Sequence, residues 1–408
     1  MSPPAVPPIS LTQVVIHADS GGTRLGSLAI DRWFRSRAHG GLRIEPLVRE
    51  DILCALAHTM TLKYGYLRLP FGGAKGAVAG DPDAERSTRQ GLLDRYAQAI
   101  GPLLRSRAFV PAADMGTDED LIRGAMRASG SPLSPRQLKV ARSGDHTAWT
   151  VFHTLRAAAA YLGLSVRGKT AALEGFGKVG LPLARLLAEA GVRVVAISTA
   201  RGALYDPDGL DIPRLAACAD RIGSRVVEDS ALGRRQPPDT LAAMPVDILL
   251  PCAGVHSLHA GNAALVHARL ICPGANNPAT PDAEALLTDQ GKLVVPDFLA
   301  NYGGVLGSVL EFARLPQHRI RRLMKEHVEA HLPRLLALAK DRREPLRAVG
   351  ESLAMARYQT MVEEWACQRR GPRLVDLGVW MYHRGLVPAA LFSRLAAPSL
   401  ERRLAWEA

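Results

Sequence analysis

Residues 169–180 read KTAALEGFGKVG, and this stretch decides the fold of the second half of the chain. Lys169–Glu174 has the short apolar run of a buried strand, and three glycines with the spacing GxGxxG follow it directly. We expect a helix from Gly180 to about residue 190 and a second strand over Val192–Ser198. The glycines therefore stand in a strand–helix–strand context, which predicts a Rossmann domain.

The glycine-rich turn is suited to the pyrophosphate of a dinucleotide. Gly175 permits a tight turn, Gly177 lets phosphate approach the backbone, and Gly180 allows close packing of helix and strand. The helix N-terminus adds amide donors and a favourable dipole. Thr199 stands where an acidic residue normally accepts the ribose hydroxyls of NAD, and Arg201 follows it. The absence of a carboxylate favours NADP or the use of both cofactors, unless Arg201 points into solvent.

A second informative stretch is KYGYLRLPFGGAK, which spans Lys63 to Lys75. Apolar residues at helical spacing predict a helix over about residues 50–64 that carries Lys63 in its last turn. A Leu-Pro-Phe-Gly-Gly turn would then lead to Lys75, and its glycines would admit a small ligand close to the backbone. A lysine shielded from water there titrates low enough to act as a base. The alternative is a surface loop with two solvated lysines.

A third stretch, AFVPAADMGTDED, places an aspartate between a strand and a helix. We expect the strand at Ala108–Pro111, the loop at Asp114, and a helix capped by Thr117. Loops that follow strands often carry catalytic groups in α/β proteins. Asp114 is therefore either a catalytic carboxylate or a second capping residue.

Composition narrows the classes of function. The 408 residues suggest two domains, and 47% hydrophobic with 22% charged residues describe an ordinary globular protein. The net charge of +12 is scattered and aromatics are only 5%, so we expect no nucleic-acid partner. No apolar run is long enough for a membrane span, and residues 1–10 lack the features of a secretory signal. Five cysteines without CxxC spacing favour reduced thiols in the cytoplasm, and no metal site is predicted.

The chain resembles the Glu/Leu/Phe/Val dehydrogenase family over about residues 12–365. The resemblance is closest to glutamate dehydrogenase, with a compact N-terminus like that of leucine dehydrogenase. It implies an N-terminal α/β oligomerisation and substrate domain at about 10–145, completed by helices at about 331–368. It also implies a Rossmann NAD(P)-binding domain at about 146–330, which leaves 369–408 as an extension of unknown role. Seven motifs in the family's order carry it: HGGLR, TLKYGYLRLPFGGAKG, VPAADMGTDED, LEGFGKVG, GALYDPDGLD, PGANNPATP and VPDFLANYGGVLGS.

The resemblance also assigns roles to individual residues. It makes Lys75 the catalytic lysine, Asp114 the carboxylate that exchanges protons with the amino group, and Lys63 the holder of the substrate α-carboxylate. The other expected substrate contacts are His39, Gly40, Asn301 and Ser308. The expected cofactor contacts are Thr150, Gly175, Phe176, Gly177, Lys178, Val179, Gly180, Thr199, Arg201, Ala253, Asn276 and Asn301.

The activity that the resemblance implies is reversible oxidative deamination of an L-amino acid to a 2-oxo acid and ammonia by a homo-oligomer. Glutamate enzymes have a lysine and a serine at the positions of His39 and Ser308, whereas leucine-type enzymes have apolar residues. The mixed pair favours glutamate or another polar amino acid. A leucine-, valine- or phenylalanine-type enzyme, a biosynthetic relative that diverts the imine or oxo acid, and a non-catalytic paralogue stay open. Two departures from the family pattern, Tyr302 and the segment Gly254–His256, favour the biosynthetic relative. A third departure, Lys178, either adds a charge near the pyrophosphate or points away from it.

Overall fold

The computed structural model describes residues 12–14, 24–131, 142–367, 378–379, 381–382 and 384–405. The chain divides into two compact units, each with its own sheet, which confirms the predicted two-domain α/β class. Unit 1 comprises Met1–Gly65, Leu69–Leu138 and Tyr358–Gln368, and unit 2 comprises Tyr66–Arg68, Lys139–Arg357 and Arg369–Ala408.

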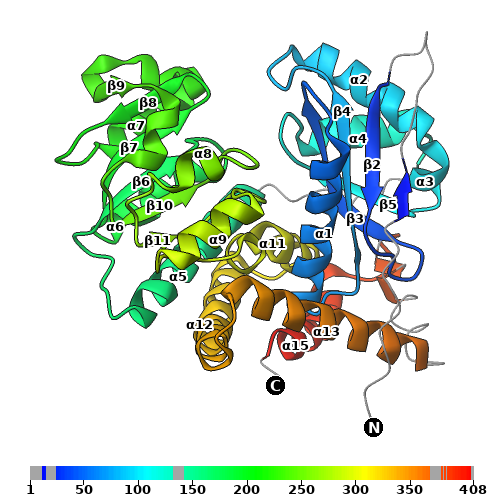
Figure 1. Ribbon diagram of the computed structural model, residues 1–408. Helices are drawn as coiled ribbons and strands as arrows, with labels where there is room; N and C mark the ends of the chain where they lie inside the picture. Colours follow the sequence, from blue (N-terminus) through cyan, green and yellow to red (C-terminus); the bar gives the residue numbers. More distant parts are fainter. Residues whose placement is uncertain are drawn as a thin grey trace. The chain divides into compact units, whose positions relative to one another are not determined.

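The sheet of unit 1 carries Lys75 on β4 (Gly72–Ala79), and it carries His39 and Gly40 on the neighbouring β3 (Ala38–Glu45) (Figure 1). Strand β3 runs parallel to both β4 and β5, whereas β2 is antiparallel to β4 and to β1. In sheet order the strands are β1 (Thr12–Val14), β2 (Gly26–Ile30), β4 (Gly72–Ala79), β3 (Ala38–Glu45) and β5 (Phe109–Ala113).

Helices cover both faces of this sheet. Helix α1 (Glu50–Tyr66) packs Leu53 and Ala57 against small side chains of β2 and β4 on one face. A larger apolar core fills the other face, because β-strand side chains alternate and every second residue points that way. That core is closed by α2 (Arg86–Ala99), α3 (Gly101–Arg105) and α4 (Glu119–Ala128).

The glycines before Lys75 belong to a strand, so the predicted Leu-Pro-Phe-Gly-Gly turn is wrong in its second half. Gly72 and Gly73 are the first residues of β4. A Cβ on Gly73 would overlap Thr61 of α1, and one on Gly72 would overlap the carbonyl of Arg32. The two glycines therefore allow helix α1 and the backbone at Arg32 to pack closely against β4, and they do not open space for a ligand.

The sheet of unit 2 has five parallel strands, as the strand–helix–strand pattern predicts. Two further strands, which the sequence pattern did not predict, form an antiparallel edge. Its sheet order is β12-β11-β10-β6-β7-β8-β9. The parallel strands are β6 (Thr170–Glu174), β7 (Arg193–Thr199), β10 (Ile248–Pro251), β11 (Leu270–Ile271) and β12 (Leu293–Val294). The antiparallel edge is β8 (Gly202–Tyr205) and β9 (Arg234–Gln236).

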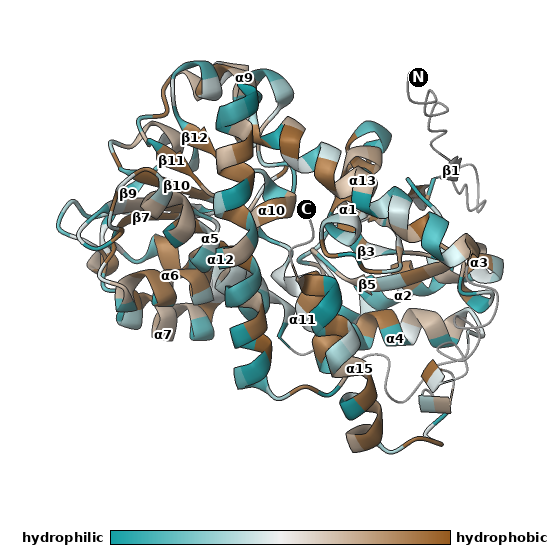
Figure 2. Ribbon diagram, turned by 90° about the horizontal axis from the view of Figure 1, so that it is seen from below, coloured by the Kyte–Doolittle hydropathy of each residue, from teal (hydrophilic) through white to brown (hydrophobic). Residues whose placement is uncertain are grey.

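Helices of unit 2 enclose this sheet and extend into a separate helical layer. Helix α5 packs along α11 and α12, and α12 alternates polar and apolar residues along its length (Figure 2). Helix α13 belongs to unit 2 as far as Arg357 and to unit 1 beyond it, so the domain limits inferred from the sequence stay predictions. The helices are α5 (Ser143–Tyr161), α6 (Gly180–Glu189), α7 (Ile212–Ile222), α8 (Ala260–Ala263), α9 (Pro281–Asp289), α10 (Asp297–Ala300), α11 (Gly303–Phe312), α12 (Gln317–Arg342), α13 (Leu346–Cys367) and α15 (Ala389–Leu404).

The described part of the C-terminal extension packs onto α11 and α12. Tyr382 is fully buried, its ring stacks on Phe392 at 3.9 Å, and its hydroxyl donates to the carbonyl of Phe312 at 3.1 Å. Glu401 of α15 pairs with Arg319 of α12 at 2.5 Å. Within the part of the chain that the structure describes, no helix has both the length and the apolar character that crossing a bilayer requires.

Candidate functional site

Lys75 and Asp114 meet in the interior of unit 1. Lys75 lies in the middle of β4 and is 3% exposed, and Asp114 follows the end of β5. The Lys75 ammonium lies 2.5 Å from Oδ2 of Asp114. Strand β3 runs between these two strands, and a Cβ on its Gly41 would lie 3.0 Å from the Lys75 nitrogen. The missing side chain of Gly41 therefore lets the ion pair pack directly against the backbone of β3.

Two further charged residues extend the pair, and sequence reasoning missed both. Nε of Arg43 donates to Oδ2 of Asp114 at 3.1 Å, and Nη1 of Arg43 donates to Oε2 of Glu45 at 3.4 Å. The side chains are 7% exposed for Arg43 and 14% for Glu45. Positions 41, 43 and 45 share one face of β3, since side chains alternate along a strand. The alternation in GGLRIE was the signal that could have identified them.

The charges of this cluster shift the protonation of its members. Burial lowers the pKa of Lys75 from its usual 10.5 and the cation of Arg43 lowers it further, although Asp114 opposes both. Burial alone would raise the pKa of Asp114, but Lys75 and Arg43 outweigh it and hold that pKa below 3.8. Lys75 is thus a lysine that loses its proton more readily than usual, beside a carboxylate that stays ionised.

The loop that carries Asp114 is fixed by Thr117 rather than by a helix cap at that residue. The Thr117 hydroxyl accepts from the backbone N–H of Asp114 and donates to the carbonyl of Leu42, both at 2.8 Å. The cap of α4 is Asp118, whose carboxylate accepts from the amides of Asp120 and Leu121. The prediction that Thr117 caps this helix was wrong, and the Asp114 side chain does not serve as a cap.

The other candidate substrate residues of unit 1 lie on β3 and α1. Lys63 is in the last turn of α1 and is 4% exposed, so the surface-loop alternative is excluded for both lysines. The ring of His39 lies 4.3 Å from that of Phe71, and burial together with Arg37 lowers its pKa to about 3. A Cβ on Gly40 would overlap the carbonyl of Ala74, so this glycine permits the close approach of β3 and β4.

The glycine-rich turn of unit 2 has the geometry of a phosphate cradle. Gly175 has a φ of +86°, which favours glycine, and a Cβ there would lie 2.8 Å from that of Ala253. A Cβ on Gly177 would meet open space, whereas one on Gly180 would overlap the carbonyl of Gly175. Helix α6 begins at Gly180, and its N-cap, Val179, gives no side-chain cap to the first amides. Those amides fit an anionic group. The two remaining residues of the turn differ, since Phe176 is buried and Lys178 is exposed.

Asn301 presents a buried acceptor that has no hydrogen-bond partner among the described residues. Its Nδ2 donates to the carbonyls of Ala275 at 2.8 Å and Gly274 at 3.2 Å and to Oδ1 of Asn276 at 3.1 Å. These three oxygens fix the orientation of the amide. Oδ1 of Asn301 therefore faces the other way and lacks a partner, although the residue is 4% exposed. A ligand with an N–H donor would satisfy it.

Thr199 and Arg201, the residues expected near the cofactor ribose, lie at the end of β7 and in the turn directly after it. The Thr199 hydroxyl donates to the carbonyl of Ser224 at 2.9 Å and accepts from the Arg201 amide at 3.1 Å. The guanidinium of Arg201 is exposed and lies 3.8 Å from Glu228. Arg201 is thus neither buried nor isolated, and a phosphate would compete with Glu228 for it.

Three further residues of unit 2 have hydrogen bonds within the protein. The Thr150 hydroxyl accepts from the Gly303 amide at 3.1 Å and donates to the carbonyl of Thr147, which ties α5 to the start of α11. The Ser308 hydroxyl donates to the carbonyl of Gly304 at 2.6 Å within α11. Tyr302 is fully buried, and its hydroxyl lies 2.8 Å from Nδ1 of His327. The Tyr302 ring therefore packs in the core of unit 2, against the rings of Tyr66 and His327.

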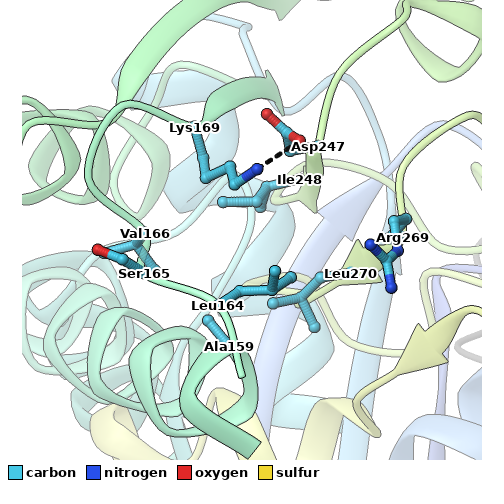
Figure 3. Close-up of a pocket in the computed structure, with 9 residues that line it drawn as sticks. All are labelled: Ala159, Leu164, Ser165, Val166, Lys169, Asp247, Ile248, Arg269 and Leu270. Carbon is cyan, nitrogen blue, oxygen red and sulfur yellow. Dashed lines mark hydrogen bonds and ion pairs between the residues drawn. The ribbon is translucent and has the colours of Figure 1, made fainter. Parts of the chain in front are cut away.

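A shallow pocket in unit 2 contains none of the predicted site residues (Figure 3). It lies where β6, β10 and β11 begin, at the opposite end of these parallel strands from the glycine-rich turn. Its Lys169 pairs with Asp247 at 3.3 Å, as Figure 3 shows. In the described ranges no three His, Cys, Asp or Glu side chains gather in a way that would hold a metal ion.

Comparison with known proteins gives the same assignment over most of the chain. The family model described as Glutamate/Leucine/Phenylalanine/Valine dehydrogenase matches residues 141–364, and the model of the dimerisation domain of these enzymes matches residues 16–129. The chain is 35% identical over 295 residues to glutamate dehydrogenase of Thermotoga maritima, covering 69% of this chain and 70% of that protein. It is 31% identical over 343 residues to NAD-specific glutamate dehydrogenase of Staphylococcus aureus, covering 78% and 80%.

A solved structure supports this assignment. The hetero-hexameric glutamate dehydrogenase of Thermus thermophilus, in its leucine-bound form, has a TM-score of 0.73 at 28% identity, covering 87% of this chain and 89% of that chain. The family resemblance inferred from the ordered motifs is thereby confirmed. The chain belongs to the Glutamate/Leucine/Phenylalanine/Valine dehydrogenase family, NAD(P)-dependent oxidoreductases that act on the CH–NH2 group of amino acids.

Proposed function

We propose that this chain catalyses the reversible oxidative deamination of L-glutamate to the 2-oxo acid and ammonia, with Lys75 and Asp114 as the catalytic residues. The observation that carries the proposal is the buried Lys75–Asp114 pair at 2.5 Å, in a unit where Lys63 is a second buried lysine. A buried cation next to a reacting centre selects substrates that bring a negative charge. Lys63 as the partner of the α-carboxylate fits this requirement.

The proton chemistry follows from the environment of each group. Burial favours the neutral amine of Lys75, so Lys75 takes a proton from the water that adds to the substrate imine. The resulting ammonium then stabilises the negative oxygen that develops on the substrate carbon. Asp114 stays ionised at neutral pH and exchanges a proton with the substrate nitrogen as its charge changes. Gly41 lets Lys75 and Asp114 lie close against the backbone of β3.

The residues of unit 2 fit a dinucleotide. Gly175, Gly177 and the first amides of α6 would hold the pyrophosphate, and the unpartnered Oδ1 of Asn301 would accept an N–H of the ligand. The bound nicotinamide supplies the hydride acceptor of the reaction. Ala253 lies beside Gly175, Asn276 accepts from Asn301, and Thr150 accepts from the Gly303 amide, which supports these three of the further contacts inferred from the sequence.

For the choice of cofactor we propose that NADP is accepted alongside NAD. Thr199 brings no carboxylate that would repel a 2′-phosphate, and the exposed Arg201 offers a cation nearby. Glu228 lies 3.8 Å from that cation, so it moderates the attraction. The Staphylococcus aureus relative is named NAD-specific, which supports the use of NAD.

The surroundings of His39 favour a second candidate substrate. A neutral His39 offers an N–H to a side-chain carboxylate but no charge, and Phe71 and Tyr64 lie beside it. This aromatic setting favours an amino acid without a side-chain carboxylate, such as leucine, valine or phenylalanine. The names of the relatives favour glutamate, which Ser308 and Gly40 were also expected to contact.

We also propose that the enzyme is a cytoplasmic homo-oligomer. The match of residues 16–129 to a domain described as a dimerisation domain supports self-association. The Thermus thermophilus structure is described as a hetero-hexamer, which supports an assembly of several subunits. Light scattering of the purified protein at several concentrations tests the homo-oligomer, and a monomer at all of them would refute it.

The decisive experiment for the proposed function is a substrate panel. Purified protein is mixed with each proteinogenic amino acid, or with each 2-oxo acid plus ammonia, in the presence of NAD(H) or NADP(H). We expect the absorbance of the reduced cofactor to report turnover with glutamate, and product analysis to show the 2-oxo acid. A product other than the oxo acid would favour a biosynthetic relative, and cofactor binding without any turnover would favour a non-catalytic paralogue. Either result would overturn the proposal.

A further inference from the structure

We propose that Arg43 and Glu45 are positioning residues whose opposite charges set the protonation of Lys75 and Asp114. The proposal rests on the proposed function, in which Lys75 is the base and Asp114 exchanges the proton. Neither Arg43 nor Glu45 is assigned to contact the substrate. They act through the two residues that do.

The geometry forms one continuous row of alternating charges. Glu45 contacts Arg43 at 3.4 Å, Arg43 contacts Asp114 at 3.1 Å, and Asp114 contacts Lys75 at 2.5 Å. Arg43 and Lys75 both bind Oδ2 of Asp114, which leaves Oδ1 of that carboxylate to the substrate nitrogen. Because all four side chains are at most 20% exposed, water screens these interactions weakly.

The surrounding elements bring few competing charges. Ala29 of β2 lies opposite Lys75, and the residues of β2 include no charged side chain. Asp114 comes from the loop after β5, and Arg43 and Glu45 come from β3. Helix α1 covers the same face of the sheet and carries the buried Lys63. The charged side chains that bear on the ammonium of Lys75 are Asp114, Arg43 and Glu45.

The two positioning residues act in opposite directions. The cation of Arg43 lowers the pKa of Lys75, whereas the anion of Glu45 raises it. Arg43 also lowers the pKa of Asp114, and Glu45 and Asp114 disfavour each other's ionised form. Removing Arg43 should therefore raise the pKa of both catalytic groups, and neutralising Glu45 should lower both. A purely structural role would not produce shifts of opposite sign.

The experiment compares the pH dependence of kcat/KM for wild type, Glu45→Gln, Arg43→Met and the double variant. On the acid limb Lys75 must lose its proton, so we expect Glu45→Gln to raise kcat/KM at a fixed pH by about threefold or more. Arg43→Met should lower it by a similar factor, and the double variant should return towards wild type. Arg43→Lys keeps the positive charge, so it should leave the acid limb of the pH profile near its wild-type position.

A control variant and a second readout separate this effect from general damage to the protein. Asp51→Asn neutralises an exposed carboxylate that pairs with Arg49 at 2.6 Å, and it should leave the pH profile unchanged. A second readout is the pH dependence of labelling of Lys75 by an amine-specific reagent, measured by mass spectrometry with the exposed Lys340 as reference. The labelling midpoint should move down in Glu45→Gln and up in Arg43→Met.

The outcomes distinguish this inference from the proposed function. If no amino acid is turned over but the labelling midpoints move in opposite directions, the proposed function fails and the charge row stands. If wild type is active and both variants fold, but Glu45→Gln and Arg43→Met shift the acid limb and the labelling midpoint in the same direction as each other, or not at all, the charge row is refuted. The labelling readout therefore decides the inference even when catalysis is absent.

Discussion

Replacing Gly41 by alanine inserts a methyl group beside the Lys75–Asp114 pair. The new Cβ would lie 3.0 Å from Nζ of Lys75, 3.0 Å from Oδ2 of Asp114 and 2.9 Å from Cβ of Asp114. Ordinary contacts begin at 3.4 Å, so these atoms must move by about 0.4 Å. Catalytic geometry is sensitive on this scale, and a misplacement of about 1 Å can cost about a hundredfold. We expect kcat to fall about tenfold or more, with about 1–3 kcal/mol lost in stability.

Initial rates and thermal unfolding of three variants test this reasoning. Gly91→Ala is the control, because Gly91 is exposed in α2 and its new Cβ would meet no heavy atom within 4 Å. That variant should keep its activity and gain about 0.5–1 kcal/mol of stability. Gly40→Ala should mainly destabilise the fold, since its Cβ would overlap the Ala74 carbonyl. A folded Gly41→Ala protein with kcat within about twofold of wild type would refute the role assigned to the pair.

Three further predictions concern stability and cofactor choice. Asp114→Asn should lower the free energy of unfolding by on the order of 3 kcal/mol. Because the folded pKa of Asp114 is below 3.8, denaturant titrations should show this destabilisation above about pH 4. It should disappear at lower pH, where the wild-type carboxylate gains a proton and loses its ion pairs. Thr117→Val should cost about 1–3 kcal/mol and lower kcat, because the Asp114 amide and the Leu42 carbonyl lose their partner, whereas Thr117→Ser should be near wild type in both measurements. Arg201→Ala should reduce kcat/KM with NADP about tenfold and leave NAD little changed; equal losses with both cofactors would contradict the assigned role.

The sequence predicted the dinucleotide unit well because its signals are local. The spacing of Gly175, Gly177 and Gly180 determines both the turn and the start of α6, and the flanking apolar runs became β6 and β7. The order of motifs identified the family. The position of Lys63 in the last turn of α1 was also read correctly from helical periodicity.

The errors arose where long-range packing decides a residue's role. Gly72 and Gly73 were interpreted as a turn, but they lie in β4 because α1 and the Arg32 carbonyl pack against them. Arg43 was overlooked because its ion-pair partner, Asp114, is 71 residues away in the sequence. The two residues come together only through the pairing of β3 with β5. Tyr302 was named as a departure from the family pattern that bears on the reaction, and it lies in the core beside His327. No local pattern contains these partners.

The measurement that tests the central claim most directly is turnover by Lys75→Ala with the best substrate of the panel, beside an independent measurement of NAD(P) binding. If Lys75 is the base, kcat should fall by a factor of at least about 10²–10⁴, the range that general acid–base catalysis supplies. Cofactor affinity should stay at the wild-type level, because the glycine-rich turn is in the other unit. Turnover by Lys75→Ala within tenfold of wild type would contradict the assignment of Lys75 as the catalytic base.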